Sequence, residues 1–423
     1  MFKVASLCIA VLFAGGQTMK IRRWRAFGAL LSTTMLLGIV ADVHAQGQNL
    51  RGFKDPNQGL RVAKQGMFFV GGQYYTSSID GLKYMSGQMY VEYQIPEVVT
   101  HPYPIVMIHG AAQTGSNFIA TPDGQPGWAQ FFVANGYAVY IADQVGRGRS
   151  NYALEQYNAF GPPLDVLSRQ KNWSLQQEYK LFPRGYMHTQ WPGTGREGDP
   201  FFDQYYASQV QWNRNGVWTQ TVAQAAGAAL LDRIGQAIVV THSQSGTFGF
   251  LIADKRPNLV RGVVTVEGGG TPRGYTAVGA PTWFEDAPVT GGASWGIASI
   301  PITYDPPVTD PGQLAYVREE KAEGPDVRCW VQGSPARQLP NLKRVPQLLV
   351  VGEASSAAST NRCVSRYLTQ AGVPNTWVDL GTVGIHGNGH MMMLERNELE
   401  IAAFMADWLQ DNVEKGIRAP ATR

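Results

Sequence analysis

Residues 237–246 read Ala237-Ile238-Val239-Val240-Thr241-His242-Ser243-Gln244-Ser245-Gly246. A β-branched run ends abruptly in small and polar residues, and a helical pattern begins at Gly246. This order predicts a strand, a sharp turn and a helix, with Ser243 at the turn in a strained conformation that points its side chain out of the sheet. The positive end of the helix dipole then faces the serine. We therefore predict that Ser243 is a nucleophile and that the backbone N–H of Gln244 binds an oxyanion.

Two positions beside this serine depart from the usual pattern of such turns. Thr241 and Ser245 stand where glycines are common, because small residues are needed two positions away on either side. An ordinary strand-to-helix turn with a serine N-cap is therefore also compatible with the segment. Ser245 is a rival nucleophile, although the end of the strand favours Ser243.

Strand-length apolar runs and helical patterns alternate on both sides of this segment. Strands are expected at 67–70, 88–93, 105–108, 137–141, 237–241, 262–266, 347–351 and 375–380. Helices are expected within 124–135 and over 217–231, 246–254, 357–371 and 395–413. This alternation predicts an α/β fold with a mostly parallel central sheet flanked by helices. Residues 151–215 and about 271–313 break the rhythm, and we expect them to be cap or lid insertions in a single domain of residues 46–423.

The first 45 residues have the pattern of a secretory signal peptide. Residues 20–25 are basic, residues 26–40 are apolar, and residues 43–45 match a cleavage site. The mature chain is then expected to begin near Gln46 and to be periplasmic or secreted. A true start at Met19 and an uncleaved signal anchor are also compatible with this pattern.

Charge and cysteine content exclude several classes of function. The chain carries a formal net charge of +3, and the leader holds five basic residues and one acidic residue, so the mature part is close to neutral. No nucleic-acid partner is indicated. No apolar run after the leader reaches the roughly 18 residues of a membrane span. Cys329 and Cys363 remain after the leader is removed, and either a disulfide or two buried thiols is compatible with them.

A second strand ends in a loop that suits oxyanion binding. The segment reads Ile105-Val106-Met107-Ile108-His109-Gly110-Ala111. We assign the second oxyanion N–H to Ala111, with Gly110 allowing the backbone to come close. His109 is expected to brace this loop rather than to act as a base. The turn at residues 143–150, after the next strand, is expected to support the fold rather than the chemistry.

Two histidines precede the last predicted helix. A serine nucleophile usually takes histidine as its general base, because the pKa of histidine lies near the working pH. His390 stands immediately before the closing helix and is favoured over His386. A metal site at this pair is disfavoured, since the residues lie in a glycine-rich loop without an apparent third ligand. The methionines at 391–393 are expected to pack in the core.

The acid that would orient the histidine has two candidates. Glu267 and Glu353 both follow predicted strands, and either keeps the order serine, acid, histidine. The commoner topology favours Glu353. Glu267, however, is followed by three glycines and a predicted insertion. A simple structural turn does not explain this arrangement.

Taken together, these landmarks resemble the α/β-hydrolase superfamily over about residues 65–415. The His-Gly loop, the D-x-x-G-x-G-x-S turn, the serine turn and the late histidine occur in that order. The motifs Thr-His-Ser-Gln-Ser-Gly, Val-Glu-Gly and His-Gly-Asn-x-His-Met-Met-Met are similar to those of a small group of bacterial secreted esterases. The resemblance implies an acid after the sixth strand, which by position is Glu267, with Glu353 in reserve.

The sequence therefore predicts a serine esterase of the α/β-hydrolase fold. Its expected residues are a triad and two oxyanion N–H groups: Ser243, His390, Glu267, Ala111 and Gln244. No cofactor or metal is required. An amidase, peptidase or lactonase would use the same residues, and a non-catalytic binding protein of this fold is the alternative from another class.

The expected partner is a small-molecule ester with an apolar or aromatic group, and a homodimer is compatible with the sequence. The insertion at 151–215 is rich in aromatic residues, among them Trp173, Tyr179, Phe182, Tyr186 and Trp191. These side chains are expected either to line a substrate pocket or to form a small core of the insertion.

Overall fold

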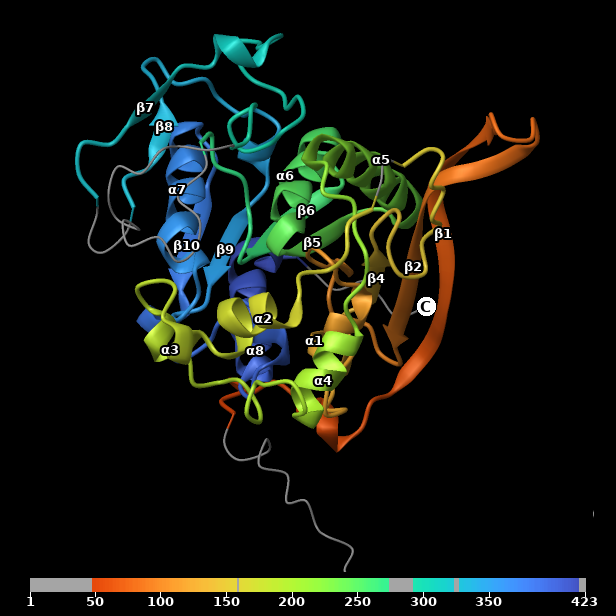
Figure 1. Ribbon diagram of the computed structural model, residues 1–423, viewed down its shortest axis with the longest axis vertical. Coiled ribbons are helices and arrows are strands. Elements are labelled where there is room, and N and C mark those ends of the chain that lie inside the picture. Colours follow the sequence, from red (N-terminus) through yellow and green to blue (C-terminus); the bar gives the residue numbers. More distant parts are fainter. Residues whose placement is uncertain (1–47, 158–159, 274–291, 323–326, 418–423) are drawn as a thin grey trace, which may run out of the picture. The chain divides into compact units, whose positions relative to one another are not determined.

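The computed structural model describes residues 48–157, 160–273, 292–322 and 327–417, and its centre is an eight-stranded sheet in the order β1-β2-β4-β3-β5-β6-β9-β10 (Figure 1). The strands are β1 (Val62–Thr76), β2 (Lys83–Pro96), β3 (Ile105–Ile108), β4 (Val139–Asp143), β5 (Ala237–His242), β6 (Val260–Val266), β9 (Gln347–Val351) and β10 (Asn375–Asp379). The β1–β2 and β2–β4 pairs are antiparallel, and every other neighbouring pair is parallel. A separate ribbon pairs β7 (Tyr316–Arg318) with β8 (Trp330–Gln332).

Helices cover both faces of this sheet and create two cores. The first core contains residues of α5 (Gly216–Ile234), α6 (Gly246–Lys255) and α7 (Ala357–Gln370), and the second contains residues of α1 (Trp128–Ala134) and α8 (Glu398–Leu409). Alternate residues of β3 divide between them, with Val106 in the first core and Met107 in the second. Because parallel strands are buried on both sides, they appear in the sequence as continuous apolar runs.

The predicted fold class is confirmed, and the strands at 105–108 and 347–351 have the predicted bounds. Three differences follow from local chemistry. Strands β1 and β2 extend well beyond their apolar centres, because they continue as an antiparallel hairpin whose outer residues are polar or exposed. The closing helix begins at Glu398 rather than at 395, after a 3₁₀ turn over Met392–Leu394. The β7–β8 ribbon is too short to leave a pattern in the sequence.

The α-helices in the described part of the insertion at 151–215 are short: α2 (Val166–Arg169), α3 (Gln176–Tyr179) and α4 (Pro200–Ala207). Its aromatic residues serve different purposes. Trp191 is buried in the second core with residues of α4, Phe182 is also buried, and Tyr186 is exposed. The described part of the second insertion contributes Ile297 to the first core.

The predicted leader at 1–45 and residues 274–291 of the second insertion lie outside the described residues. Within the described residues, no helix combines the length and the apolar character that crossing a bilayer would require.

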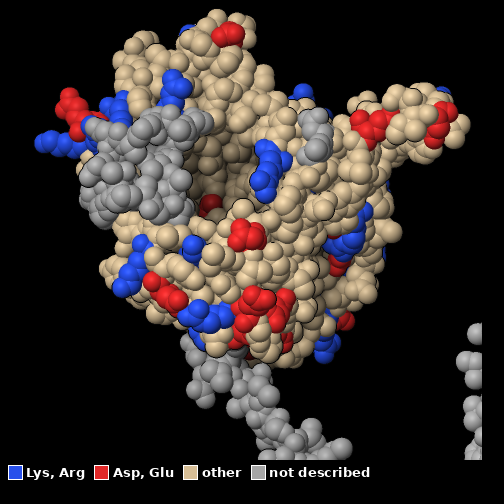
Figure 2. All heavy atoms as spheres, viewed as in Figure 1, with Lys and Arg blue, Asp and Glu red and all other residues tan. Residues whose placement is uncertain are grey.

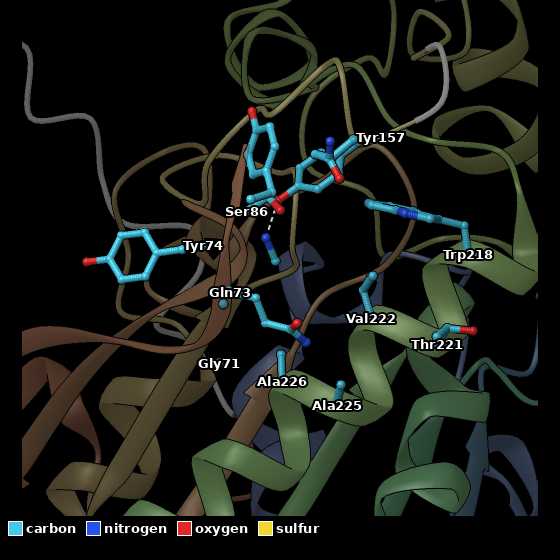
Figure 3. A pocket seen from close by; sticks show the side chains of 14 residues that line it. Gly71, Gln73, Tyr74, Ser86, Tyr157, Trp218, Thr221, Val222, Ala225 and Ala226 are labelled. Carbon is cyan, nitrogen blue, oxygen red and sulfur yellow. Dashed lines mark hydrogen bonds between the residues drawn. The ribbon is translucent and has the colours of Figure 1, made fainter. Parts of the chain in front are cut away.

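A hollow of about 530 Å³ lies between the β1–β2 hairpin and α5 (Figure 3). The rings of Tyr157 and Trp218 lie 4.9 Å apart in its wall, and the Tyr157 hydroxyl accepts the N–H of Gly87 at 2.5 Å. None of the predicted site residues lines this hollow.

Cys329 and Cys363 form a disulfide, which decides between the two alternatives that the sequence leaves open. The bridge joins the segment before β8 to helix α7 across 34 residues of sequence.

Replacing both cysteines with serine is expected to lower the free energy of unfolding by about 2–4 kcal/mol, because the bridge restricts the unfolded chain. Urea denaturation of the wild type and the double variant measures this difference. Reductant should destabilise the wild type and leave the variant unchanged. Equal stability of the double variant and the disulfide-bonded wild type would contradict the expectation.

Candidate active site

Ser243 lies between the end of β5 and the start of α6 with a φ of 56°. This left-handed conformation is rare for a residue with a side chain. Glycines allow the backbones around it to come together. A Cβ on Gly246 would collide with the backbone of Gly268 and Gly269, and a Cβ on Gly268 would collide with the carbonyl oxygen of Ser243. Of the three glycines after Glu267, Gly268 is therefore needed for packing against the serine turn.

Ser245 has a structural position that differs from that of Ser243. Its hydroxyl is fully buried, donates to the carbonyl of Ile108 at 2.7 Å and accepts the N–H of His242 at 2.9 Å. It thereby joins the ends of β3 and β5, and it is closed to a substrate. Ser243, by contrast, is partly exposed.

The structure brings Ser243, His390 and Glu267 together in one chain of hydrogen bonds. The Nε2 atom of His390 lies 3.0 Å from the Oγ of Ser243, and its Nδ1 lies 3.1 Å from the Oε2 of Glu267. Glu267 also accepts the N–H of Gly352 at 2.5 Å and the hydroxyl of Ser355. The carboxylate is thus fixed by backbone and side chain from the segment after β9.

The two alternative residues form a pair of their own. The Nδ1 of His386 lies 3.1 Å from the Oε1 of Glu353, and Oε2 of that carboxylate accepts the N–H of Gly387 at 2.9 Å. The His386 side chain is 64% exposed. Neither residue has a hydrogen bond to Ser243 within the described residues.

A buried network holds the loop that carries His390. Glu395 accepts the side-chain N–H of Asn388 at 2.9 Å and the backbone N–H of Gly389 at 3.0 Å. The same carboxylate lies 2.8 Å from the Nε2 of His188, which comes from the insertion. The insertion also supplies Trp173, whose ring stacks on that of His390 with centroids 5.4 Å apart. The sequence analysis did not identify Glu395 or His188, because their pairing depends on segments that are far apart in the sequence.

Arg147 connects the two predicted oxyanion segments. Its Nη1 donates to the carbonyl of Gly110 at 3.1 Å, and its Nη2 donates to the Oε1 of Gln244 at 3.0 Å. The same carbonyl accepts the Nδ1–H of His109 at 2.9 Å, while the Nε2 of His109 accepts the N–H of Gln144. His109 therefore braces the loop, as expected for it.

These contacts orient the N–H of Ala111. A peptide bond is planar and trans, so its C=O and N–H point in opposite directions. Fixing the carbonyl of Gly110 therefore fixes the N–H of Ala111. A Cβ on Gly110 would lie 2.9 Å from the Cβ of Ser243, so glycine is needed for this approach. Gln244 lies in the first helical turn, where N–H groups lack an acceptor within the helix.

The turn at 143–150 also contacts both predicted oxyanion segments, through Arg147. The sequence contained part of the signal: Arg147 is a cation inside a glycine-rich turn, which follows the strand after the His-Gly loop. The sequence did not show which residues the Arg147 side chain contacts, because only the fold brings it to Gln244.

Burial controls the charge state of the histidines. It lowers the pKa of His390 to about 4, and the positive charge of Arg169 acts in the same direction. The ring is therefore neutral near pH 7 and can accept a proton. Burial also holds the pKa of His242 well below its usual value, and the Nε2–H of this ring donates to the carbonyl of His390 at 2.9 Å. Burial raises the pKa of Glu267, and the hydrogen bonds from Ser355 and Gly352 oppose this rise.

The site is open to solvent. Ser243, Gln244, Ala111, Trp173 and His390 are each partly exposed. Figure 2 shows a hollow in this face of the protein. In the same view in Figure 1, the hollow lies above α2 and beside α6, and α6 begins at the serine turn. No group of three His, Cys, Asp or Glu side chains in the described part of the chain could hold a metal ion.

Comparison with known proteins identifies relatives. The sequence model of the alpha/beta hydrolase family matches residues 105–404. A relative named "probable secreted lipase phiG", from Fungal sp. (strain ATCC 74256), is 39% identical over 384 residues, which are 90% of this chain and 96% of the relative. A solved structure described as a novel bacterial esterase has a TM-score of 0.54 and 23% identity, and the match covers 84% of this chain and 98% of that one. The likeness to this structure concerns the fold.

The low pKa of His390 can be measured directly. We expect its ring to titrate with a midpoint near 4, because burial disfavours the charged imidazolium. The Cε1–H signal in NMR spectra recorded between pH 3 and pH 8 gives this midpoint, and a His390→Gln variant assigns the signal. A midpoint at or above 6.5 would contradict the electrostatic description of the site.

Proposed function

The chain belongs to the alpha/beta hydrolase family, and we propose that it is a secreted carboxylic ester hydrolase that forms an acyl-enzyme on Ser243. The observation that carries this proposal is the hydrogen-bonded chain from Ser243 through His390 to Glu267, with distances of 3.0 Å and 3.1 Å. A neutral imidazole within hydrogen-bond distance of a hydroxyl can take its proton during attack on a carbonyl carbon.

In the first half of the reaction, the Oγ of Ser243 forms a bond with the ester carbon, and its proton moves to the Nε2 of His390. Glu267 stabilises the imidazolium through Nδ1–H. The carbonyl oxygen becomes an oxyanion, which the N–H groups of Ala111 and Gln244 bind. The bond to the alkoxy group then breaks as His390 returns its proton to the leaving alcohol.

In the second half, water attacks the acyl carbon of the acyl-enzyme. His390 accepts a proton from this water and then gives it to the Oγ of Ser243 as the carboxylic acid leaves. The same oxyanion groups act again. This chemistry needs no cofactor, since the protein supplies nucleophile, base, acid and oxyanion donors.

Substrate and location follow from neighbouring features. The ring of Trp173 beside His390 offers an aromatic wall for an apolar or aromatic part of a small ester. The relative named a probable secreted lipase and the leader pattern at residues 1–45 both support export of the mature chain.

A panel of variants tests the proposed roles on a short-chain p-nitrophenyl ester. Ser243→Ala and His390→Ala should reduce kcat by about 10⁴-fold or more, and Glu267→Gln by about 10³- to 10⁴-fold. The matched controls are Ser245→Ala for the serine and Glu353→Gln for the acid, and Glu353→Gln should change kcat by less than about twofold. Ser245→Ala should mainly lower stability, because its hydroxyl joins two strands.

The panel also has outcomes that would reject these roles. Full activity in Ser243→Ala would exclude this nucleophile. A larger loss in Glu353→Gln than in Glu267→Gln would move the acid to the other pair.

Arg147→Met should lower kcat by about 10- to 100-fold with a smaller effect on KM, because the oxyanion N–H of Ala111 loses its orientation while ground-state binding remains. Steady-state kinetics measure this, and circular dichroism checks the fold. Arg214→Met is the control, since Arg214 lies over the same Trp212 ring and donates instead to Pro162. An equal effect of the two substitutions on kcat would contradict the role of Arg147.

A further inference from the structure

Arg169, the last residue of α2, is a buried cation that forms no ion pair with a carboxylate among the described residues. It is 1% exposed, and neither its Nε nor its Nη1 has a hydrogen-bond acceptor among the described residues. The carboxylate of Asp165, whose charge acts on it, lies at the other end of α2, where it accepts from the N–H and hydroxyl of Ser168. Burying a guanidinium in this way is costly unless a counter-ion satisfies it.

Two other arginines, Arg147 and Arg149, have acceptors for their charged groups. Arg147 is equally buried but donates to Gly110 and Gln244. Arg149 forms an ion pair with Asp143. In contrast to these two residues, Arg169 has N–H groups at Nε and Nη1 without an acceptor among the described residues. We infer that a ligand supplies this acceptor.

Arg169 lies beside the reacting groups. Its guanidinium carbon is 3.7 Å from the centre of the Trp173 ring, that ring stacks on His390, and His390 contacts Ser243. Its charge is close enough to lower the pKa of His390, after the larger effect of burial. The cation and His390 therefore both lie against the same aromatic ring.

A second polar group without a partner lies nearby. The hydroxyl of Tyr205 is buried and has no hydrogen-bond partner among the described residues. Burial raises the pKa of Tyr205, and the charge of Arg169 opposes this rise, so the two groups are within electrostatic reach. Both belong to the insertion at 151–215.

We propose that Arg169 is the anion-binding group of the substrate site, and that the substrate is an ester that carries a free carboxylate, such as a monoester of a dicarboxylic acid. This inference rests on the proposed ester hydrolysis. The planar guanidinium matches the two oxygens of a carboxylate and remains charged at working pH. Because the ring of Trp173 contacts both Arg169 and His390, it is positioned to pack against the chain that links the carboxylate to the scissile ester.

The experiment compares matched esters on the wild-type protein. The monoethyl esters of succinic, glutaric, adipic and pimelic acids are assayed by pH-stat beside neutral ethyl esters of the same chain length. For at least one chain length, kcat/KM should favour the monoester on the order of 10- to 100-fold, because a charge-assisted pair forms only with that substrate. Arg169→Met should reduce the ratio of the two kcat/KM values to about one, and Arg169→Lys should retain part of the preference for the monoester. Arg196→Met, a substitution of an arginine that is 51% exposed and paired with Glu178, should leave the ratio unchanged.

The outcomes separate this inference from the proposed function. Hydrolysis of the neutral esters without any preference for monoesters would overturn the role of Arg169 alone, as would an equal loss on both substrate types in Arg169→Met. A wild type inactive on every ester would overturn the proposed function and this inference with it. If Arg169→Met does not fold, competitive inhibition of the wild type by adipic acid monoamide and by the neutral hexanamide decides: the monoamide, which alone carries a carboxylate, should inhibit about tenfold more strongly, and equal inhibition would overturn the proposal.

Discussion

The left-handed backbone of Ser243 is the constraint on which the site depends. Such a conformation costs about 1–2 kcal/mol for a residue with a side chain, so it persists only where surrounding contacts enforce it. Those contacts include the close approach of the glycine backbones at 246 and 268. Glu267 has the same φ of 56°, so the backbone that holds the serine also turns its carboxylate toward His390.

The sheet register explains why residues from distant segments meet at this point. Thr241 of β5 pairs with Ile108 on one side and with Thr265 on the other, and Val266 pairs with Val350 of β9. The carboxyl ends of four parallel strands are therefore level. The segments that follow them carry the residues proposed as oxyanion loop, nucleophile and acid, and the donors to the Glu267 carboxylate. Only His390 comes from a separate loop, and the buried contacts of Glu395 hold it in place.

Sequence reasoning reached the parts of this arrangement that depend on local patterns. Apolar runs predicted the parallel strands. The turn at Ser243 was also predicted, because its whole pattern lies within one short segment, residues 237–246. The choice between Glu267 and Glu353 could not be made from the residues, because both follow strands and differ only in which histidine they meet. Arg147, Glu395 and Arg169 were missed for the same reason: a buried cation or carboxylate is defined by its partners across the fold. The hairpin extension of β1 and β2 was missed because its outer residues carry no apolar pattern.

The most direct test of the central claim is covalent trapping of the nucleophile. The protein is treated with a fluorophosphonate, digested with trypsin, and the peptide that contains residues 243–245 is sequenced by tandem mass spectrometry. The hydrogen bond from Ser243 to a neutral His390, together with the buried and fully engaged hydroxyl of Ser245, predicts a single adduct on Ser243 and loss of activity in proportion to labelling. An adduct on Ser245, or complete loss of activity with Ser243 unmodified, would contradict it.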